Sequence, residues 1–489
     1  MLHPLRLVLL AFFLVPFGSH GALTNDVIAR ATAAVTAAAP RAQADPARPI
    51  FHVTSPAQWI NDPNGPIFYK GYYHLFYQLH PFSDASGPKY WGHVRSRDLV
   101  KWEALPIALW PSSEAGETEV WSGCCTINGL GQPMCFYTSI GPDKNAFDRA
   151  DQWAAIGDDD LITWRKSPAN PVLTEAVNEG KKIYDWRDPF IFNDGEKTFL
   201  VTGGHMAKDR EAAVNIYEAE NPELTKWKYR GVMFQHPDAG APTVECPNFF
   251  KLGDQWVLFV SPYGQVQYFV GDFDAATCRF TARTRGVLDY GSSFYAPNTM
   301  QVPDGRRLVW GWLNGFPGGH GWNGCLSLPR QLSVSPAGEL RQNPAPQLSQ
   351  LRGQPVEWKN IRLENGGQTL PLPKTNTLEI LAELDLQTAK SIGLTIKGGA
   401  QDAAPILIQF TDSELQVMDA KAPLTVAKDG RLRLRIFIDR SVLEVFANET
   451  VGLTKIISPL GDTPTLELHA EGGPARAKRI QAWPLKTLW

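Results

Sequence analysis

A motif made of an acidic residue, a leucine and, three positions after the leucine, a tryptophan recurs three times in the first half of the chain. It occupies residues 98–102, 160–164 and 223–227, so its tryptophans are 62 and 63 residues apart. Short aromatic and β-branched runs recur over the same region, at residues 73–77, 134–138, 198–202, 256–260 and 307–311. A period of this length predicts one supersecondary unit repeated about five times.

The repeated units are predicted to be small β-sheets. The chain has 42 Gly, 38 Pro and 11% aromatic residues, a mixture that favours many short strands joined by turns. Sheets of four strands repeated around an axis form a β-propeller, in which most strand edges are protected. We therefore predict an all-β protein with a five-bladed propeller over residues 50–340, in which the five aromatic runs are the inner strands. The alternative is a sandwich with coincidentally similar strands.

A change of pattern after the repeats predicts a second domain. Residues 341–355 contain three prolines and several polar residues, which is typical of a linker. Beyond it, Leu378, Ile380, Ala382, Leu384 and Leu386 alternate with the residues between them, and the segment 431–438 alternates in the same way. This period of two predicts a β-sandwich over residues 356–489. The arginines that alternate with Leu432 and Leu434 are predicted to face solvent.

The N-terminus combines a targeting pattern with an alanine-rich segment. Arg6 precedes an apolar run over residues 7–17, which is too short to span a bilayer, so residues 1–21 are predicted to be a signal peptide and the protein to be secreted. An uncleaved anchor is the alternative. Alanine makes up ten of the nineteen residues 29–47, without sustained apolar periodicity. Residues 22–49 are therefore predicted to be a linker or mobile leader.

Composition excludes several classes of function. The formal net charge is −3 and the pI is near 6.4, so the chain lacks the basic footprint of a nucleic-acid-binding protein. Neither a CxxC pair nor an HExxH motif is present, and we predict no metal site and no cofactor. Among the six cysteines, Cys124 or Cys125 is predicted to face Cys135 across a hairpin, where a disulfide or free buried thiols are the two alternatives.

Three carboxylates stand in polar motifs, each in a different predicted blade. Asp62 lies within residues 59–65, Asp188 follows Arg187, and Glu245 stands between an apolar residue and a cysteine. Taken singly, each has a structural alternative: Asp62 could cap its own turn, Asp188 could form a structural ion pair, and Glu245 could be a surface residue at a strand end. Because equivalent loops of a propeller meet at one end of its channel, we predict that the three converge. Arg187 is expected to keep Asp188 ionised, and burial would raise the pKa of Glu245.

Two carboxylates that flank a bond are the equipment of glycoside hydrolysis. One attacks the sugar or activates water, and the other protonates the departing oxygen; a third could hold sugar hydroxyls. Aromatic rings can pack on the apolar face of a sugar. Trp91, Trp121 and Trp312 stand near predicted strand ends, and each is either such a platform or a core residue.

The motifs together resemble those of glycoside hydrolase family 32, which includes invertases, inulinases, levanases and fructan exohydrolases. The family's opening motif Trp-x-Asn-Asp-Pro-Asn-Gly stands at Trp59–Gly65, its Arg-Asp-Pro motif at Arg187–Pro189 and its Glu-Cys pair at Glu245-Cys246. Residues 121–123, 294–297 and 439–448 are similar to further family motifs. The resemblance covers residues 50–489 in the family's order.

The resemblance implies a propeller followed by a sandwich, and a retaining mechanism on a β-fructofuranosyl group. Asp62 matches the nucleophile, Glu245 the acid/base and Asp188 the residue that stabilises the transition state. A retaining pair of carboxyl groups is expected about 5–5.5 Å apart. The resemblance places nine further residues at the substrate: Asn61, Gln78, Trp91, Ser122 and Arg187 in the fructosyl pocket, with Trp59, Trp121, Tyr295 and Trp312 around it.

Departures from the family pattern bear on specificity. Asn248 stands where many plant invertases carry an Asp associated with sucrose preference, and residues 82–91 depart from the family pattern. Both are expected to act on the leaving side of the scissile bond, where the departing sugar binds. Asp62, where endo-inulinases usually carry Glu, favours exo action. The resemblance thus implies a secreted enzyme that releases terminal fructose from sucrose, inulin or levan. The alternatives are an arabinan- or xylan-cleaving hydrolase and a non-catalytic carbohydrate-binding propeller. No nucleic-acid or membrane partner is expected, and a homo-oligomer is compatible with the sequence.

Overall fold

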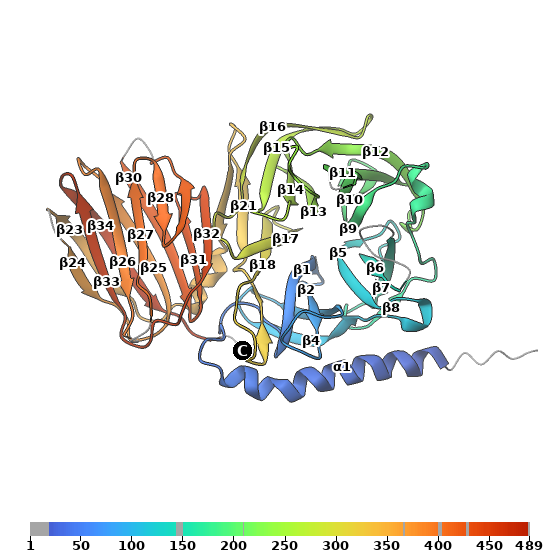
Figure 1. The fold of residues 1–489 in the computed structure, drawn as a ribbon, viewed down its shortest axis with the longest axis horizontal. Helices are drawn as coiled ribbons and strands as arrows, with labels where there is room; N and C mark the ends of the chain where they lie inside the picture. The colour runs from blue at the N-terminus through green and yellow to red at the C-terminus, as the bar shows by residue number, and fades with distance from the viewer. Residues whose placement is uncertain are drawn as a thin grey trace, which may run out of the picture.

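The computed structural model describes residues 19–142, 150–208, 210–364, 367–399, 403–426 and 430–487. The predicted signal peptide, residues 1–21, lies almost wholly outside these ranges. The described residues form a β-propeller followed by a β-sandwich (Figure 1). The predicted all-β fold class is confirmed.

Five sheets make up the propeller, three of them from four consecutive strands each. The first holds β1 (Gln58–Tyr69), β2 (Tyr72–His80), β3 (Tyr90–Ser96), β4 (Trp102–Leu109) and the late strand β19 (Trp322–Asn323), and the second β5 (Glu119–Ile127), β6 (Pro133–Ile140), β7 (Asp151–Gly157) and β8 (Trp164–Lys166). The third holds β9 (Tyr184–Asp194), β10 (Lys197–Ala207), β11 (Arg210–Ala219) and β12 (Trp227–Gln235), and the fourth β13 (Glu245–Leu252), β14 (Gln255–Ser261), β15 (Gln267–Asp274) and β16 (Arg279–Val287). The fifth holds β17 (Phe294–Gln301), β18 (Arg307–Leu313), β20 (Cys325–Leu326), β21 (Arg330–Val334) and β22 (Leu340–Pro344). Two short 3-10 helices, η1 (Ser113–Ala115) and η2 (Glu175–Asn178), lie in connections.

The five aromatic runs are not the innermost strands, so that part of the prediction is wrong. They form β2, β6, β10, β14 and β18, the second strand of each sheet, whereas β1, β5, β9, β13 and β17 contact one another around the central channel. A second strand is covered on both faces by neighbouring sheets, and every residue of β6 is buried. Continuous apolar runs therefore mark the second strands, while the innermost strands carry the polar residues of the channel.

The acidic-Leu-x-x-Trp repeat marks the same corner of three blades. Its tryptophans, Trp102, Trp164 and Trp227, begin the outermost strands β4, β8 and β12. Its leucines, Leu99, Leu161 and Leu224, all have left-handed backbone conformations with φ of 64°, 57° and 57°. In the first copy, Asp98 Oδ1 accepts hydrogen bonds from the backbone N–H of Val100 and Lys101. The repeat is thus a tight turn that precedes the last strand of a blade.

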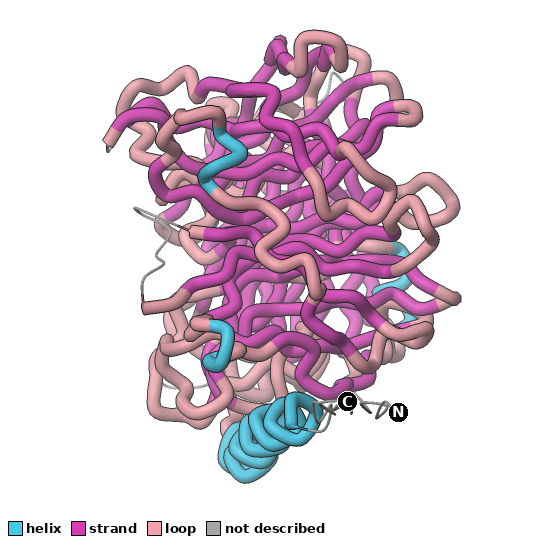
Figure 2. Tube along the Cα trace, turned by 90° about the vertical axis from the view of Figure 1, so that its right-hand side faces the viewer, coloured by secondary structure: helices cyan, strands magenta, loops and turns pink. Residues whose placement is uncertain are grey.

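Residues 22–49 are not a linker or mobile leader, because most of them form helix α1 (Ser19–Ala44). The helix runs beneath the propeller in Figure 1, is seen nearly end-on in Figure 2, and contacts β1 and β4. Ala31, Val35 and Ala42 are buried against the propeller. Alanine has the highest helix propensity, and its small side chain lets the helix pack closely without a strong apolar stripe. No helix in the described part of the chain has the length and apolarity needed to cross a bilayer.

The predicted linker 341–355 is also ordered. It begins within β22, the last strand of the fifth blade, and continues as the 3-10 helix η3 (Pro346–Leu351). The sandwich then pairs two six-stranded sheets across a core of alternating apolar residues. One sheet holds β23 (Val356–Leu363), β34 (Ala475–Pro484), β25 (Thr377–Asp385), β30 (Arg431–Asp439), β31 (Val442–Ala447) and β32 (Val451–Ile456). The other holds β24 (Gln368–Pro371), β33 (Thr465–Glu471), β26 (Ser391–Lys397), β27 (Ile406–Thr411), β28 (Glu414–Val417) and β29 (Ala420–Pro423).

One of the arginines predicted to face solvent does not do so. Arg435 Nε lies 2.7 Å from Oε1 of Glu379, a fully buried residue, and the guanidinium also donates to the Pro344 carbonyl of the propeller. Arg352 pairs with the same carboxylate at 2.6 Å. This face of the sandwich packs against the end of the fifth blade, so the alternating arginine at 435 serves the domain contact.

A fully buried ionic cluster ties the propeller to the sandwich. His52 Nδ1 lies 2.8 Å from Asp439 Oδ2 and its Nε2 lies 3.0 Å from Glu444 Oε1. Arg330 completes the cluster, with Nη2 2.7 Å from Glu444 and 2.9 Å from Asp289. Asp439 also accepts backbone N–H groups from residues 50–52. Each buried charge is therefore compensated by a partner that is distant in sequence, as burial of charge requires.

Protonated His52 is expected to make the stability of the protein fall at alkaline pH. Burial alone would lower its pKa, but the hydrogen bonds to Asp439 and Glu444 raise the pKa to about 9, from an ordinary value of 6.5. A raised pKa in the folded state gives a stabilisation that is complete below pH 6.5 and is lost as pH rises through about 9. Urea unfolding measured across this range should show a decline in the free energy of unfolding.

The variant His52→Gln should flatten that decline and cost about 3–5 kcal/mol at neutral pH, because it leaves the buried Asp439 without its cation and Glu444 with Arg330 alone. His320→Gln is the matched control, since His320 pairs with Asp45 at a site where its side chain is 45% exposed. Exposed pairs of this kind contribute little. An unchanged pH profile in His52→Gln would contradict the assignment.

The hairpin of the second blade holds one of the two predicted cysteine pairings. Cys125 and Cys135 are directly opposite on β5 and β6 and form a disulfide, whereas Cys124 is a free buried thiol, as are Cys246, Cys278 and Cys325. The denatured, unreduced protein is therefore expected to titrate with four thiols per chain in a colorimetric assay, and with six after reduction. Six thiols before reduction would contradict the pairing.

Candidate active site

The candidate site lies where the five innermost strands begin. Each blade has a shift of register there, a feature typical of a β-bulge that turns side chains out of the regular alternation. The shifts fall between Ile60 and Pro63, Val120 and Gly123, Val201 and Gly203, Glu245 and Asn248, and Tyr295 and Asn298. Asp188, Cys246 and Ala296 have left-handed backbone conformations at these points, which is uncommon for residues with a Cβ. Strain of this kind is concentrated at functional sites.

A pocket of about 430 Å³ occupies this end of the channel. Ten of the twelve predicted site residues line it: Asn61, Asp62, Gln78, Trp121, Ser122, Arg187, Asp188, Glu245, Tyr295 and Trp312. The structure therefore brings the three carboxylates together, although 183 positions separate the first from the last in the sequence. Trp59 and Trp91 are the two predicted residues that do not line the pocket.

Asp62 is held on both sides by hydrogen-bond donors. Ser122 Oγ donates to Asp62 Oδ2 at 2.5 Å, and Asn61 Nδ2 donates to Oδ1 at 3.1 Å. The Cys246 thiol lies 3.6 Å from Oδ2. Donors to both oxygens of a carboxylate fix the direction in which those oxygens point. Asp62 is thus presented to the pocket as an oriented carboxylate.

A small relay of amides supports this orientation. Gln78 donates to Ser122 Oγ at 2.8 Å and accepts from Asn61, whose own oxygen accepts from the Trp59 indole at 3.0 Å. Trp59 thus lies behind Asn61, and its ring packs edge-on against the pocket residue Trp312. These side chains come from three strands, and each holds the next in place.

Asp188 is the most buried of the three carboxylates. It accepts the backbone N–H of Cys246 at 2.8 Å, and the Cys246 sulfur lies 3.5 Å from its Oδ2. Burial raises the pKa of Asp188 to about 6, although the nearby Arg187 acts to lower it. Arg187 lowers the pKa of Asp188, as expected, but the effect of burial is larger, so the net shift is upward and Asp188 is ionised above a pH of about 6. Since the same sulfur contacts Asp62 and Asp188, the two carboxylates face one point of the pocket.

Glu245 is bound differently. Tyr295 Oη donates to its Oε2 at 2.5 Å, and Arg187 pairs with its Oε1. Burial raises the pKa of Glu245 to about 7, and Arg187 acts against this shift. The predicted rise is confirmed. A carboxyl group with this pKa can both donate and accept a proton near neutral pH, as general acid–base catalysis requires.

Arg187 and the predicted tryptophans differ in how they relate to the pocket. The guanidinium of Arg187 pairs with Asp185 at 3.0 Å and with Glu245, and it lies over the Trp121 ring. Trp91 is a core residue rather than a platform: it is fully buried, and its indole donates to the Trp121 carbonyl. Trp121 and Trp312 do reach the pocket.

Several pocket residues were not predicted. Ser86, Gly87, Pro88 and Lys89 line it from the connection between β2 and β3, and Glu119 lines it from the start of β5. Lys89 Nζ donates to Ser86 Oγ at 2.9 Å and to the Gly87 carbonyl. The sequence marks the segment 82–91 as unusual but singles out none of these residues, because the position of a loop over the channel depends on contacts made after folding. Residues 86–89 of that segment form one wall of the pocket, and their place on the leaving side remains a prediction.

Asn248, expected on the leaving side, is turned away from the pocket. Its amide donates to the carbonyls of Cys246 and Pro297 at 3.2 and 2.9 Å, and its oxygen accepts from the backbone N–H of Thr299 at 2.9 Å. The side chain is buried, and its hydrogen bonds to Pro297 and Thr299 join the fourth blade to the fifth. Its role is structural in this fold, so the expectation that it contacts the leaving group is wrong.

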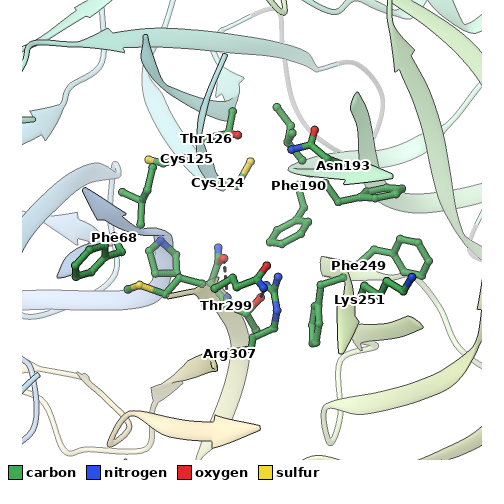
Figure 3. A pocket seen from close by; sticks show the side chains of 18 of the residues that line it. Phe68, Cys124, Cys125, Thr126, Phe190, Asn193, Phe249, Lys251, Thr299 and Arg307 are labelled. Atoms are coloured by element: carbon green, nitrogen blue, oxygen red, sulfur yellow. Dashed lines mark hydrogen bonds between the residues drawn. The ribbon is translucent and has the colours of Figure 1, made fainter. Parts of the chain in front are cut away.

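A second cavity, of about 530 Å³, lies at the other end of the innermost strands (Figure 3). Phe68, Phe190 and Phe249 line it together with Lys251 and Arg307. None of its lining residues is an acid or a histidine, so it lacks the pair of carboxyl groups that glycoside hydrolysis uses. The carboxylates therefore place the chemistry in the smaller cavity. Among the described residues, no group of three or more histidine, cysteine or acidic side chains could hold a metal ion.

Comparison with known proteins agrees with the geometry. The model of the glycosyl hydrolases family 32 N-terminal domain matches residues 52–344, and that of the family 32 C-terminal domain matches residues 347–484. A levanase of Bacillus subtilis is 32% identical over 90% of this chain and 71% of its own length. A sucrose-6-phosphate hydrolase of the same organism is 30% identical over 84% of this chain and 88% of its own length.

Solved structures share the whole architecture. A GH32 beta-fructofuranosidase of Bombyx mori, solved in complex with sucrose, superposes with a TM-score of 0.80 at 26% identity and covers 96% of this chain and 99% of its own. An exo-inulinase of Aspergillus awamori gives a TM-score of 0.79 at 25% identity, over 91% of this chain and 99% of its own. The two-domain arrangement of Figure 1 is thus common to these enzymes.

Proposed function

Since the chain belongs to glycosyl hydrolase family 32 and is a glycoside hydrolase that acts on fructosides, we propose that it releases terminal β-D-fructofuranosyl units from sucrose or β-fructans with retention of configuration. The observation that carries this proposal is the contrast between two carboxylates of one pocket. Asp62 is held in one orientation by hydrogen bonds from Ser122 and Asn61, while burial raises the pKa of Glu245 to about 7. An oriented carboxylate suits nucleophilic attack, and a carboxyl group with a raised pKa suits proton donation.

In the first step, Asp62 attacks the anomeric carbon of the fructosyl group while Glu245 donates its proton to the departing oxygen. The bond from the anomeric carbon to that oxygen breaks, and a covalent fructosyl–enzyme ester forms. Asp188, ionised above its pKa of about 6, stabilises the positive charge that develops on the sugar ring and accepts hydrogen bonds from its hydroxyls. The separation of about 5–5.5 Å between the two carboxyl groups remains a prediction.

In the second step, Glu245 removes a proton from water, and the water oxygen attacks the anomeric carbon and displaces Asp62. Fructose leaves with its original configuration, and Glu245 regains the proton it gave away. Asn61, Gln78 and Ser122 hold Asp62 in one orientation throughout, so little rearrangement precedes either attack.

The charges of the pocket favour an uncharged leaving sugar. Asp62, Glu119, Asp188 and Glu245 line it, and its two basic side chains, Lys89 and Arg187, already bind protein groups. A phosphate on the leaving sugar would meet these acids with no cation held open for it. We therefore propose sucrose or fructans, rather than phosphorylated sucrose, as the substrate, even though several relatives are named sucrose-6-phosphate hydrolase.

Product analysis of the purified enzyme tests the proposal. Sucrose, sucrose-6-phosphate, inulin, levan and arabinan are incubated separately, and products are separated at low conversion. Fructose is expected as the first product from sucrose and from at least one fructan, because the proposed exo action removes one terminal unit at a time. Early oligosaccharides from the fructans would contradict exo action. A preference for the phosphorylated substrate would contradict the neutral leaving sugar, and sugar release from arabinan alone would contradict the substrate class.

Secretion is part of the same proposal. The basic and apolar residues of the first 21 positions support it, and cleavage near Gly21 would leave α1 almost complete. N-terminal sequencing of the exported protein is expected to begin near Ala22. Full-length protein confined to the cytoplasm would contradict it.

A further inference from the structure

Tyr263, in the connection between β14 and β15, is one of four large apolar side chains that are exposed in the described part of the chain. It is 52% exposed; the other three are Phe82, Ile127 and Leu130. A single exposed aromatic residue is ordinary on a protein surface. Tyr263 differs in two respects: its hydrogen bonds connect it to partners of the catalytic groups, and its backbone conformation is unfavourable.

Both ends of Tyr263 are one contact away from Glu245. Its hydroxyl accepts a hydrogen bond from Arg187 Nη2 at 2.7 Å and lies 3.3 Å from Asp185, and Arg187 also pairs with Glu245 Oε1. Its backbone N–H donates to Tyr295 Oη at 3.1 Å, and that hydroxyl donates to Glu245 Oε2. Tyr263 is therefore tethered at two points, its hydroxyl and its backbone N–H, to the two side chains that bind Glu245.

The backbone at Tyr263 has a φ of 55°, in the left-handed region. An aromatic residue occupies this region only when its surroundings impose it, and Gly264, which follows directly, could adopt it without cost. Tyrosine at this position therefore retains an unfavourable conformation together with an exposed ring. Such a combination points to a function for the ring itself.

We propose that the ring of Tyr263 is the platform for the sugar on the leaving side of the scissile bond, which rests on the function proposed above. Glu245 protonates the departing oxygen, so groups that surround Glu245 away from Asp62 face the leaving sugar. The exposed face of a tyrosine ring packs against the C–H face of a hexose, whether this is the glucosyl unit of sucrose or the next fructosyl unit of a fructan. Its tethered hydroxyl keeps the ring ordered before the substrate arrives, which reduces the entropy lost on binding.

Steady-state kinetics of three variants test this proposal in the full-length enzyme. Tyr263→Gly removes the ring and relieves the left-handed strain, so folding is preserved. Tyr263→Phe keeps the ring and removes only the hydroxyl. Leu130→Ala is the matched control, because Leu130 is 56% exposed and lies beyond β5 at the end of the channel away from the pocket. Sucrose and a fructan trisaccharide serve as substrates, and fructose as a competitive inhibitor.

Tyr263→Gly is expected to raise KM for both substrates by about 3- to 10-fold, the size of an aromatic packing contact, with a smaller change in kcat. Inhibition by fructose, which binds on the other side of the bond, should be unchanged. Tyr263→Phe and Leu130→Ala should keep KM within about 2-fold of the native value.

Three outcomes would overturn the platform. The first is an unchanged KM in Tyr263→Gly. The second is a loss of fructose inhibition in Tyr263→Gly as large as its rise in KM. The third is a rise in KM in Tyr263→Phe as large as that in Tyr263→Gly, which would assign the effect to the hydroxyl. A native enzyme that releases no fructose from either sugar would instead refute the proposed function, so the two failures are distinguishable.

Discussion

Replacement of Asp62 by alanine is expected to reduce hydrolysis of sucrose and fructans by about 10⁴-fold or more, because no covalent intermediate can form without the attacking carboxylate. The fold should survive. Ser122 and Asn61 lose one acceptor but keep their hydrogen bonds to Gln78, and the pocket remains open to water. Initial rates of fructose release, with a thermal unfolding curve for each protein, measure the effect.

Asp304→Asn provides the matched control, since Asp304 is an exposed aspartate in the turn between β17 and β18, where it pairs with Arg306. It should keep native activity. Acid-quenched native enzyme should also carry one fructosyl unit on the peptide that contains residue 62, and the Asp62→Ala variant should carry none. Near-native turnover by Asp62→Ala would exclude the residue as nucleophile.

The variant Glu245→Gln is expected to reduce kcat on sucrose by about 10²–10⁴-fold, the usual contribution of a general acid. Substrates with a leaving group that needs no proton, such as a fructosyl fluoride, should lose far less in the first step. The intermediate should then accumulate, because no base activates water. Added azide should restore turnover and yield a fructosyl azide. Equal losses on both substrates, without rescue by azide, would contradict the acid/base role.

The pH profile gives a second test of Glu245. The first step needs its protonated form, so activity of the native enzyme should fall as pH rises through about 7. The hydrogen bond from Tyr295 favours the charged carboxylate and thereby lowers the pKa of Glu245. Tyr295→Phe removes this bond, so the pKa of Glu245 should rise and the fall in activity should move to higher pH. An alkaline limb at the same pH in Tyr295→Phe would show that another group controls it.

The parts of the fold that could be predicted from the sequence are those determined by local chemistry. The acidic-Leu-x-x-Trp turns are local, because a nearby side chain, Asp98, Asp158 or Asn221, accepts the backbone N–H groups of each turn and each leucine takes the left-handed conformation there. The order of strands within a blade was misjudged, since an apolar run indicates burial on both faces and does not indicate distance from the axis. The alanine-rich helix α1 lacks a sustained apolar stripe, so hydrophobic periodicity does not predict it, whereas its alanine content does.

The same distinction holds at the site. Asp62, Asp188 and Glu245 could be found because each stands in a motif at the start of an innermost strand, and the propeller brings those starts together. Lys89, Glu119 and Tyr263 could not, because their places depend on loops and on hydrogen bonds between blades. Trp91 and Asn248 were placed at the substrate by resemblance, whereas packing and backbone hydrogen bonds hold them in the interior.

The cluster that joins His52 to Asp439 and Glu444 has a consequence for synthesis of the protein on the ribosome. The paired residues are 387 and 392 positions apart, so the nascent chain carries His52 for a long time before its partners emerge. At 5–20 residues per second this interval is on the order of 20 to 80 s. During it, the histidine and the backbone donors of residues 50–52 lack the carboxylates that hold them in the finished molecule. The first blade is therefore synthesised before the other sheets. The segment that leads into it, residues 50–52, gains its buried partners only after β30 and β31 have been synthesised.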